Sequence, residues 1–218
     1  VWTGDIAEDY AFDLSYWVEG EGGVLDSTLA ALASHGVSTR LYDGVLPDPT
    51  AKVVNAGIAM LKEHGCEAVL AFGGGSSIDC AKGTAIAARH PGPLKTYATI
   101  EGGSLKITDR VAPLIAVPTT SGTGSEVARG AILIVDDGRK LGFHSWFIVP
   151  KAAICDPELT FGLPPMLTAA TGMDALTHAL ESYVSTATQP ISEAMSEQSM
   201  ALIARSLRLA VAHPSNRQ

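Results

Sequence analysis

The amino-acid sequence predicts an α/β protein: an N-terminal domain built on a parallel sheet, followed by the start of an all-helical domain. Two observations carry this prediction. Short apolar runs alternate with segments of helical periodicity over the first 160 residues, which is typical of a parallel sheet covered by helices. After Asp156 no strand pattern follows, and two long helical patterns fill the rest of the chain. We expect the α/β domain over residues 1–160 and a partial helical domain over residues 161–218.

Residues 1–23 form an atypical beginning to this domain. The segment contains six acidic residues and no Lys or Arg. The spacing of Phe12 and Tyr16, with Trp17 beside them, suits one turn of helix, but no longer period follows. We therefore expect a loosely docked arm.

From Val24 onward we assign helices and strands from the spacing of apolar residues, and we place their ends at glycine and proline residues. The first helix is expected to stop at Gly36, because glycine favours helix ends, and a second helix places Val54, Ile58 and Leu61 on one face. The predicted helices cover residues 24–35, 50–64, 76–90, 166–184 and 192–212. The predicted strands cover residues 37–42, 68–72, 114–117, 131–135 and 152–155, and residues 91–110 are expected to form a loop.

A run of three glycines, residues 73–75, stands between an apolar strand and a helix. Gly74 and Gly75 allow a sharp turn and close approach of a ligand, and the amides of Ser76 and its neighbours are unpaired at the helix start. These amides and the helix dipole favour a phosphate. The alternative is structural, because Ser76 and Asp79 have the S-x-x-D spacing of a capping box. Neither G-x-G-x-x-G nor a P-loop is present.

A second loop rich in hydroxyl groups, PTTSGTGSE at residues 118–126, follows the strand at residues 114–117. Ligands of open α/β sheets bind at the carboxyl ends of strands, so two such loops can address one ligand. The backbone amides and the hydroxyls of Thr119, Thr120 and Thr123 suit phosphate or ribose oxygens. The alternative is a turn held by local hydrogen bonds.

Asp174 and His178 are four residues apart on a predicted helix, so their side chains leave the same face. A carboxylate and an imidazole suit a divalent ion such as Fe²⁺ or Zn²⁺. Two ligands do not complete a site, and the remaining histidines have no partner spacing. The alternative is an exposed Asp–His pair.

Composition restricts the class of protein. The formal net charge of −8 argues against a nucleic-acid or anionic-membrane partner, and a chain that is 46% hydrophobic and 17% charged is globular. Cys66, Cys80 and Cys155 are far apart and are expected to be reduced core residues rather than ligands. With no signal peptide or long apolar run, we expect a cytoplasmic protein that acts on a small molecule.

Four strings in order resemble the iron-containing (group III) alcohol dehydrogenase family: GGGSSIDCAK at residues 73–82, PTTSGTGSE at 118–126, DPELT at 156–160 and GMDALTHALE at 172–181. The resemblance extends from about Val24 to the C-terminus. It implies a dinucleotide-binding α/β domain that takes NAD or NADP, a helical domain, and a divalent metal that polarises the oxygen of an alcohol or carbonyl substrate, Fe²⁺ being favoured over Zn²⁺.

Carried over position by position, the resemblance implies several site residues. The cofactor would contact Gly74, Gly75, Ser76, Asp79, Thr119, Thr120 and Thr123, with Lys140 reaching a ribose. Asp174 and His178 would be the first two metal ligands. No residue is assigned as the catalytic acid or base.

Departures from the family pattern leave other hypotheses open. The family's further histidine ligands come from helices downstream of residue 218, and its opening strand is not recognisable in residues 1–23, so the chain resembles a truncated member. It could bind cofactor without turnover. A metal-independent branch resembling maleylacetate reductases is a second hypothesis, which Asp174 and His178 oppose. A third is an interaction protein or homo-oligomer that pairs through uncovered apolar side chains at Met195, Leu202, Ile203 and Leu209.

Overall fold

The structure is a computed structural model that describes residues 8–13 and 23–214. The chain divides into two compact units. Unit 1 comprises residues 1–118 and 125–155, and unit 2 comprises residues 119–124 and 156–218. The mixed α/β class predicted from the sequence is confirmed, and each unit is described below by itself.

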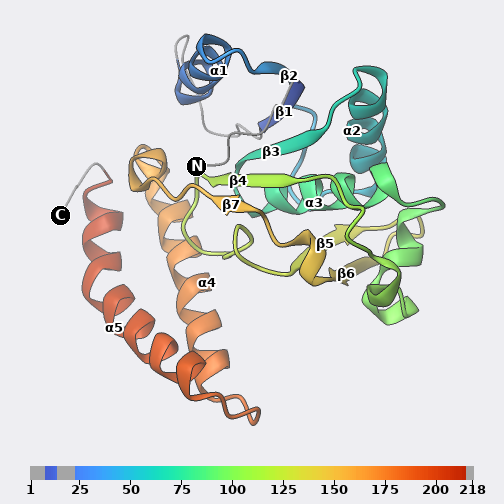
Figure 1. Ribbon diagram of the computed structural model, residues 1–218. Coiled ribbons are helices and arrows are strands. Elements are labelled where there is room, and N and C mark those ends of the chain that lie inside the picture. The colour runs from blue at the N-terminus through green and yellow to red at the C-terminus, as the bar shows by residue number, and fades with distance from the viewer. Residues whose placement is uncertain (1–7, 14–22, 215–218) are drawn as a thin grey trace. The chain divides into compact units, whose positions relative to one another are not determined.

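A five-stranded, fully parallel sheet forms the centre of unit 1 (Figure 1). The strand order is β2-β1-β3-β4-β7. Its strands are β1 (Glu8–Asp13), β2 (Ser38–Tyr42), β3 (Ala68–Gly73), β4 (Leu114–Pro118) and β7 (Ala152–Ala153). β3 and β4 are nearly continuous apolar runs, as expected for strands that are covered on both faces.

β1 corrects one prediction made from the sequence. The segment Glu8–Asp13 is not a loosely docked arm and contains no helical turn: it pairs with β2 on one side and β3 on the other. The sequence EDYAFD concealed this strand, because three acidic residues in six break the apolar run that identifies a buried parallel strand. Tyr16 and Trp17 lie outside the described residues.

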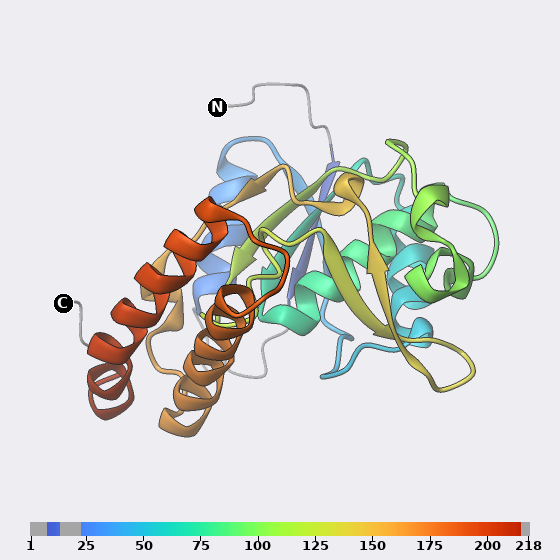
Figure 2. The same cartoon turned by 90° about the horizontal axis from the view of Figure 1, so that it is seen from below.

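The described residues of this unit form three α-helices: α1 (Val24–Ser34), α2 (Ala51–Glu63) and α3 (Gly75–Arg89). Thr50 is the N-cap of α2, and its hydroxyl accepts a hydrogen bond from the Val53 amide. Its inward face contains Val54, Ile58 and Leu61, as the sequence predicts. α3 is the most deeply buried helix of those described and packs against β3, β4 and α2 (Figure 2).

The antiparallel hairpin β5 (Gly130–Ile134) and β6 (Lys140–His144) also packs on α3. A Cβ added at Gly83 of α3 would lie 2.6 Å from Leu133 Cδ1, so any larger residue there would force the Leu133 side chain to move. The sequence predicted β5 but not β6, because KLGFH has only two buried apolar residues and a central glycine. The predicted loop at residues 91–110 contains three short 3₁₀ helices, at Leu94–Tyr97, Thr99–Glu101 and Ser104–Lys106.

Unit 2 is built on two long helices, α4 (Pro165–Tyr183) and α5 (Pro190–Ala212), which pack side by side (Figures 1 and 2). A Cβ added at Gly172 would lie 2.2 Å from Leu207 Cδ1, so glycine brings the two helices close together. The prediction of no strand after Asp156 is confirmed for the part of the chain that the structure describes.

Several large apolar side chains of α5 are exposed, among them Met195, Leu202 and Leu209, whereas Ile203 is half-buried. The sequence predicted uncovered positions for all four. None of the described helices combines the length and the apolar character that a membrane span requires. Cys66 and Cys80 are buried as predicted, but Cys155 is exposed, and none of the three forms a disulfide.

Candidate cofactor and metal sites

The glycine turn connects β3 to α3 and leaves the start of that helix open. Gly73 closes β3 with a φ of 139°, which a side chain would strain, and Gly74 is the N-cap of α3. No side chain caps this helix and no acidic residue occupies its first turn. The first amides of α3 have no partner within the helix, and the buried Ser77 Oγ has no hydrogen-bond partner among the described residues. These groups fit an anion such as a phosphate.

The alternative of a capping box at this turn is wrong. Gly74, not Ser76, is the N-cap, and the Asp79 carboxylate turns away from the helix start. Its Oδ2 accepts a hydrogen bond from the Ile132 amide at 2.8 Å, and its Oδ1 accepts one from Ser125 Oγ at 2.5 Å. Burial raises the pKa of Asp79, while these hydrogen bonds and the charge of Lys82 oppose the rise. Asp79 therefore holds the segments that follow β4.

Lys82, one turn after Asp79, is a residue to which the sequence interpretation gave no role. Its side chain is completely buried, and its ammonium donates hydrogen bonds to the segment between residues 125 and 130. The available signal was a single lysine inside a helix of small and apolar residues, AKGTAIAA. A buried charge in such a helix requires dedicated partners.

The three threonines of the second loop lie in unit 2. Thr119 and Thr120 are half-buried and Thr123 is exposed. The loop begins where β4 ends, and the last residue of β4, Pro118, pairs with Gly73 of β3. Both candidate loops thus start at adjacent strand ends, at the carboxyl edge of the sheet.

Lys140 lies at the start of β6 and forms an ion pair that the sequence did not predict. Its Nζ is 2.6 Å from Oδ1 of Asp48, and both side chains are more than half exposed, at 54% and 62%. Asp48 is the one described non-glycine residue with a positive φ, 55°. The charge of the Lys140 ammonium also opposes the rise in the pKa of Asp79 that burial causes. A ribose hydroxyl at Lys140 would share that ammonium with Asp48.

The structure brings Asp174 and His178 together on one face of α4, as the sequence predicts from their spacing. His178 Nε2 lies 3.6 Å from Asp174 Oδ2, and the two side chains are 58% and 45% exposed. Their oxygen and nitrogen donors fit two positions in the shell of a divalent metal. Within residues 8–13 and 23–214 no cluster of three or more metal-ligating side chains occurs. The pair alone supplies fewer donors than the three or four protein ligands that a metal site usually has.

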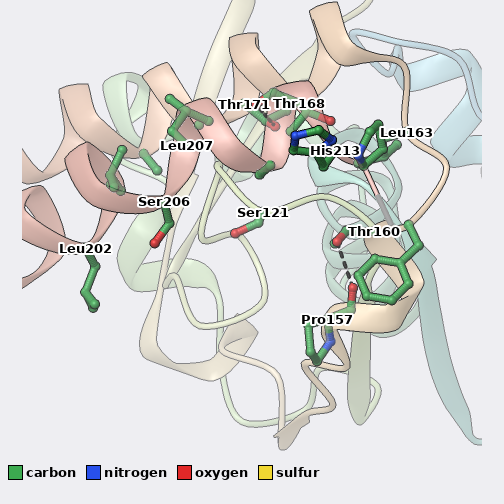
Figure 3. Close-up of a pocket in the computed structure, with 16 residues that line it drawn as sticks. Ser121, Pro157, Thr160, Leu163, Thr168, Thr171, Leu202, Ser206, Leu207 and His213 are labelled. Carbon is green, nitrogen blue, oxygen red and sulfur yellow. Dashed lines mark hydrogen bonds between the residues drawn. The ribbon is translucent and has the colours of Figure 1, made fainter. Parts of the chain in front are cut away.

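Unit 2 also contains a pocket of about 340 Å³ that the sequence did not reveal (Figure 3). Ser121 of the threonine-rich loop, Thr160 and the α4 residues Thr168 and Thr171 provide hydroxyl groups, and α5 provides Leu207 among other apolar groups. A Cβ at Gly122 would lie 2.6 Å from the Thr171 carbonyl oxygen, so this loop packs tightly on α4. The combination of apolar walls with a few polar groups is typical of small-molecule pockets.

Comparison with known proteins identifies the family. Residues 14–157 match the iron-containing alcohol dehydrogenase family, and residues 168–218 match the C-terminal part described as the Fe-containing alcohol dehydrogenase family. The chain belongs to the iron-containing alcohol dehydrogenase family, as its four motifs predict.

Individual relatives show how far the likeness extends. A 4-hydroxybutyrate dehydrogenase of Cupriavidus necator is 61% identical over 158 residues, which cover 72% of this chain and 41% of the relative. A crystal structure of a 1,3-propanediol oxidoreductase matches with a TM-score of 0.89 and 40% identity, over 96% of this chain and 54% of that one. The chain thus spans about half the length of these relatives.

A third relative was solved with its cofactor. The structure of a sulfoacetaldehyde reductase from Bifidobacterium kashiwanohense in complex with NAD⁺ matches with a TM-score of 0.85 and 32% identity, over 97% of this chain and 55% of the relative.

Proposed function

We propose that this chain is the cofactor-binding part of an NAD(P)-linked, metal-dependent alcohol dehydrogenase. The observation that carries the proposal is the open start of α3, where Gly74, Gly75 and Ser76 present unpaired amides without an acidic neighbour. Family membership and the NAD⁺ complex of the sulfoacetaldehyde reductase support it. In this proposal the α3 amides bind the cofactor pyrophosphate.

Other residues have supporting roles in the proposal. The hydroxyls of Thr119, Thr120 and Thr123 donate to phosphate and nicotinamide groups, and Lys140 donates to a ribose. Asp79 acts by fixing the Ser125 hydroxyl rather than by touching the cofactor.

Asp174 and His178 would hold a divalent metal, which would supply polarisation of the substrate oxygen, and the bound nicotinamide would supply the hydride chemistry. Iron is favoured over zinc because of the family to which the chain belongs.

The substrate proposed is a short primary alcohol or the matching aldehyde. The names of the relatives, 4-hydroxybutyrate dehydrogenase and 1,3-propanediol oxidoreductase, each contain a compound with a terminal hydroxyl and a second polar group at the other end of a short carbon chain. A homo-oligomer is proposed as the assembly, because apolar side chains such as Met195 and Leu209 are exposed on α5.

The proposal is tested by titrating the purified chain with NADH and NADPH and following nicotinamide fluorescence. Saturable binding is expected, and the cofactor that binds more tightly is assigned. Absence of binding at millimolar concentrations of both cofactors contradicts the proposal. Binding without oxidation of 1,3-propanediol or 4-hydroxybutyrate supports the second candidate, a cofactor-binding chain without turnover, which the lack of a third metal ligand among the described residues favours.

Metal binding is tested separately by calorimetric titration with Zn²⁺ and, without oxygen, Fe²⁺. Removing either ligand in Asp174→Ala or His178→Ala is expected to weaken binding by about tenfold or more, because even outer-sphere partners of metal ligands have effects of that size. His35→Ala, at an exposed position at the end of α1, is the matched control and is expected to bind like the unsubstituted chain. Equal affinity in all four proteins excludes the Asp174–His178 site.

A further inference from the structure

The Lys82 ammonium occupies a cage of backbone oxygens inside unit 1. Lys82 has no exposed surface, and its Nζ lies 2.6 Å from the carbonyl oxygen of Ser125, 2.8 Å from that of Ala128 and 2.7 Å from that of Gly130. Ser125 Oγ lies 3.3 Å from the same nitrogen. An ammonium has three protons, so three carbonyls at these distances use its full donor capacity. This geometry specifies a charged lysine at the position.

The residues that Lys82 holds form the far end of the second candidate loop. Thr119–Gly124 leaves the sheet at Pro118, which the ladder between β3 and β4 fixes by its pairing with Gly73. The loop rejoins unit 1 at Ser125, which no strand includes. At Ser125 the constraint comes instead from α3: Lys82 binds its carbonyl, and Asp79 accepts its hydroxyl.

We propose that Lys82 is a positioning residue of the cofactor site, whose ammonium fixes the point at which loop Thr119–Gly124 rejoins the fold and thereby sets cofactor affinity. This inference rests on the proposed cofactor role of that loop. The lysine is too deeply buried to contact a ligand, so its influence passes through the Ser125–Gly130 backbone. A loop that is held at only one end loses conformational entropy when the ligand orders it, which weakens binding. A loop that is held at both ends is already ordered and avoids this loss.

The contact between the Lys82 ammonium and the Ser125–Gly130 backbone is expected to depend on pH. Burial lowers the pKa of Lys82 to about 8, and the carboxylates of Asp79 and Glu126 act in the opposite direction. Asp79 lies on the same helix, and Glu126 lies in the segment that supplies the carbonyls. The remaining charged residue of that segment, Arg129, packs over the ring of Trp146 at 5.1 Å. Loss of the third proton above pH 8 leaves one carbonyl without a donor.

The effect of this proton on global stability has the opposite sign. The pKa in the folded state, about 8, lies below the ordinary value of 10.5, so the unfolded chain binds more protons between these pH values. This group alone therefore makes the free energy of unfolding rise over that range. A loss of cofactor affinity in the same range cannot come from general unfolding caused by Lys82.

The first test needs no cofactor. Amide hydrogen exchange is measured for residues 119–130 in Lys82→Met, which keeps an unbranched side chain one atom shorter and removes its donors. Exchange is expected to be about tenfold faster there than in the unsubstituted chain, while β3 keeps its protection. The matched control is Ile86→Ala, a completely buried residue one turn later on α3, which makes a cavity without touching the carbonyl cage.

The second test uses NADH affinity between pH 7.5 and 9.5. Binding by the unsubstituted chain and by Ile86→Ala is expected to weaken about tenfold over this range, whereas Lys82→Met binds weakly at every pH. Equal exchange of residues 119–130 in Lys82→Met and the unsubstituted chain overturns the proposal. A pH-independent NADH affinity of the unsubstituted chain also overturns it.

Failure of NADH to bind the unsubstituted chain at all refutes the proposed function, while the exchange result still decides whether Lys82 holds the loop. If Lys82→Met does not fold, the pH dependence of hydrogen exchange in the unsubstituted chain tests the proposal instead. Its protection at residues 119–130, corrected for base-catalysed exchange, must then fall above pH 8 relative to β3. Constant relative protection overturns the proposal.

Discussion

Ser76→Trp is expected to weaken NADH binding by about 100-fold or more, a loss of roughly 2.7 kcal/mol. Ser76 is in the first turn of α3, directly after Gly74 and Gly75, where the amides are unpaired and the serine is partly exposed. An indole at this position fills the space that a pyrophosphate needs. It removes no core contact, so the thermal midpoint is expected to change little. Fluorescence titration with NADH measures the first effect and circular dichroism the second.

The matched control is Ser27→Trp. Ser27 is an exposed serine in the first turn of α1, which also has a glycine N-cap without a side-chain hydrogen bond, but that turn contains the acidic Asp26, whose charge disfavours a phosphate. NADH affinity is expected to be unaltered in this variant. If Ser76→Trp binds NADH like Ser27→Trp, the cofactor pyrophosphate does not lie at the start of α3.

Asp79→Ala is expected to lower the free energy of unfolding by about 2–4 kcal/mol, because it removes the acceptor that two hydrogen-bond donors share. The substitution leaves the Ile132 amide and the Ser125 hydroxyl without their acceptor. It also removes the carboxylate that favours the charged form of the buried Lys82. Urea unfolding measures the loss, with the slope of the transition checked for a change in the unfolded state.

Asp136→Ala is the control for this experiment, since Asp136 is an exposed aspartate in the turn between β5 and β6. A change within about 0.5 kcal/mol is expected there. Asp79→Asn provides a second comparison: it keeps one acceptor oxygen, so its loss of stability is expected to be intermediate. Equal stability of Asp79→Ala and Asp136→Ala contradicts the structural role given to Asp79.

The sequence predicted the elements whose periodicity is local. β3 and α2 follow from apolar spacing, because each buries one face or both. The two long helices of unit 2 follow from their length and helical periodicity, although each has only one buried residue among those described. The sequence did not predict β1 and β6, because EDYAFD and KLGFH are short and lack a clear apolar pattern. Both segments become strands by pairing with strands elsewhere in the chain. Strand pairing is a tertiary property, and the local pattern contains little of it.

The candidate site divides in the same way. Motif spacing identified the start of α3 and the Asp174–His178 pair, since both lie within a few residues of chain. It did not identify the partners of Asp79, Lys82 and Lys140, which lie 43 to 92 positions away in the sequence. Long-range hydrogen bonds from polar side chains leave no periodic signal, and the structure is needed to assign them.

The position of β1 between β2 and β3 makes the sheet depend on its first strand. β2 and β3 do not pair with each other; each pairs with β1. Without Glu8–Asp13, the apolar strand β3 would become an outer strand with an unpaired row of amides and carbonyls, which is a template for intermolecular pairing. By pairing with β3, the acidic segment covers the edge of the strand that leads into the glycine turn. The sheet is expected to aggregate when this pairing is lost.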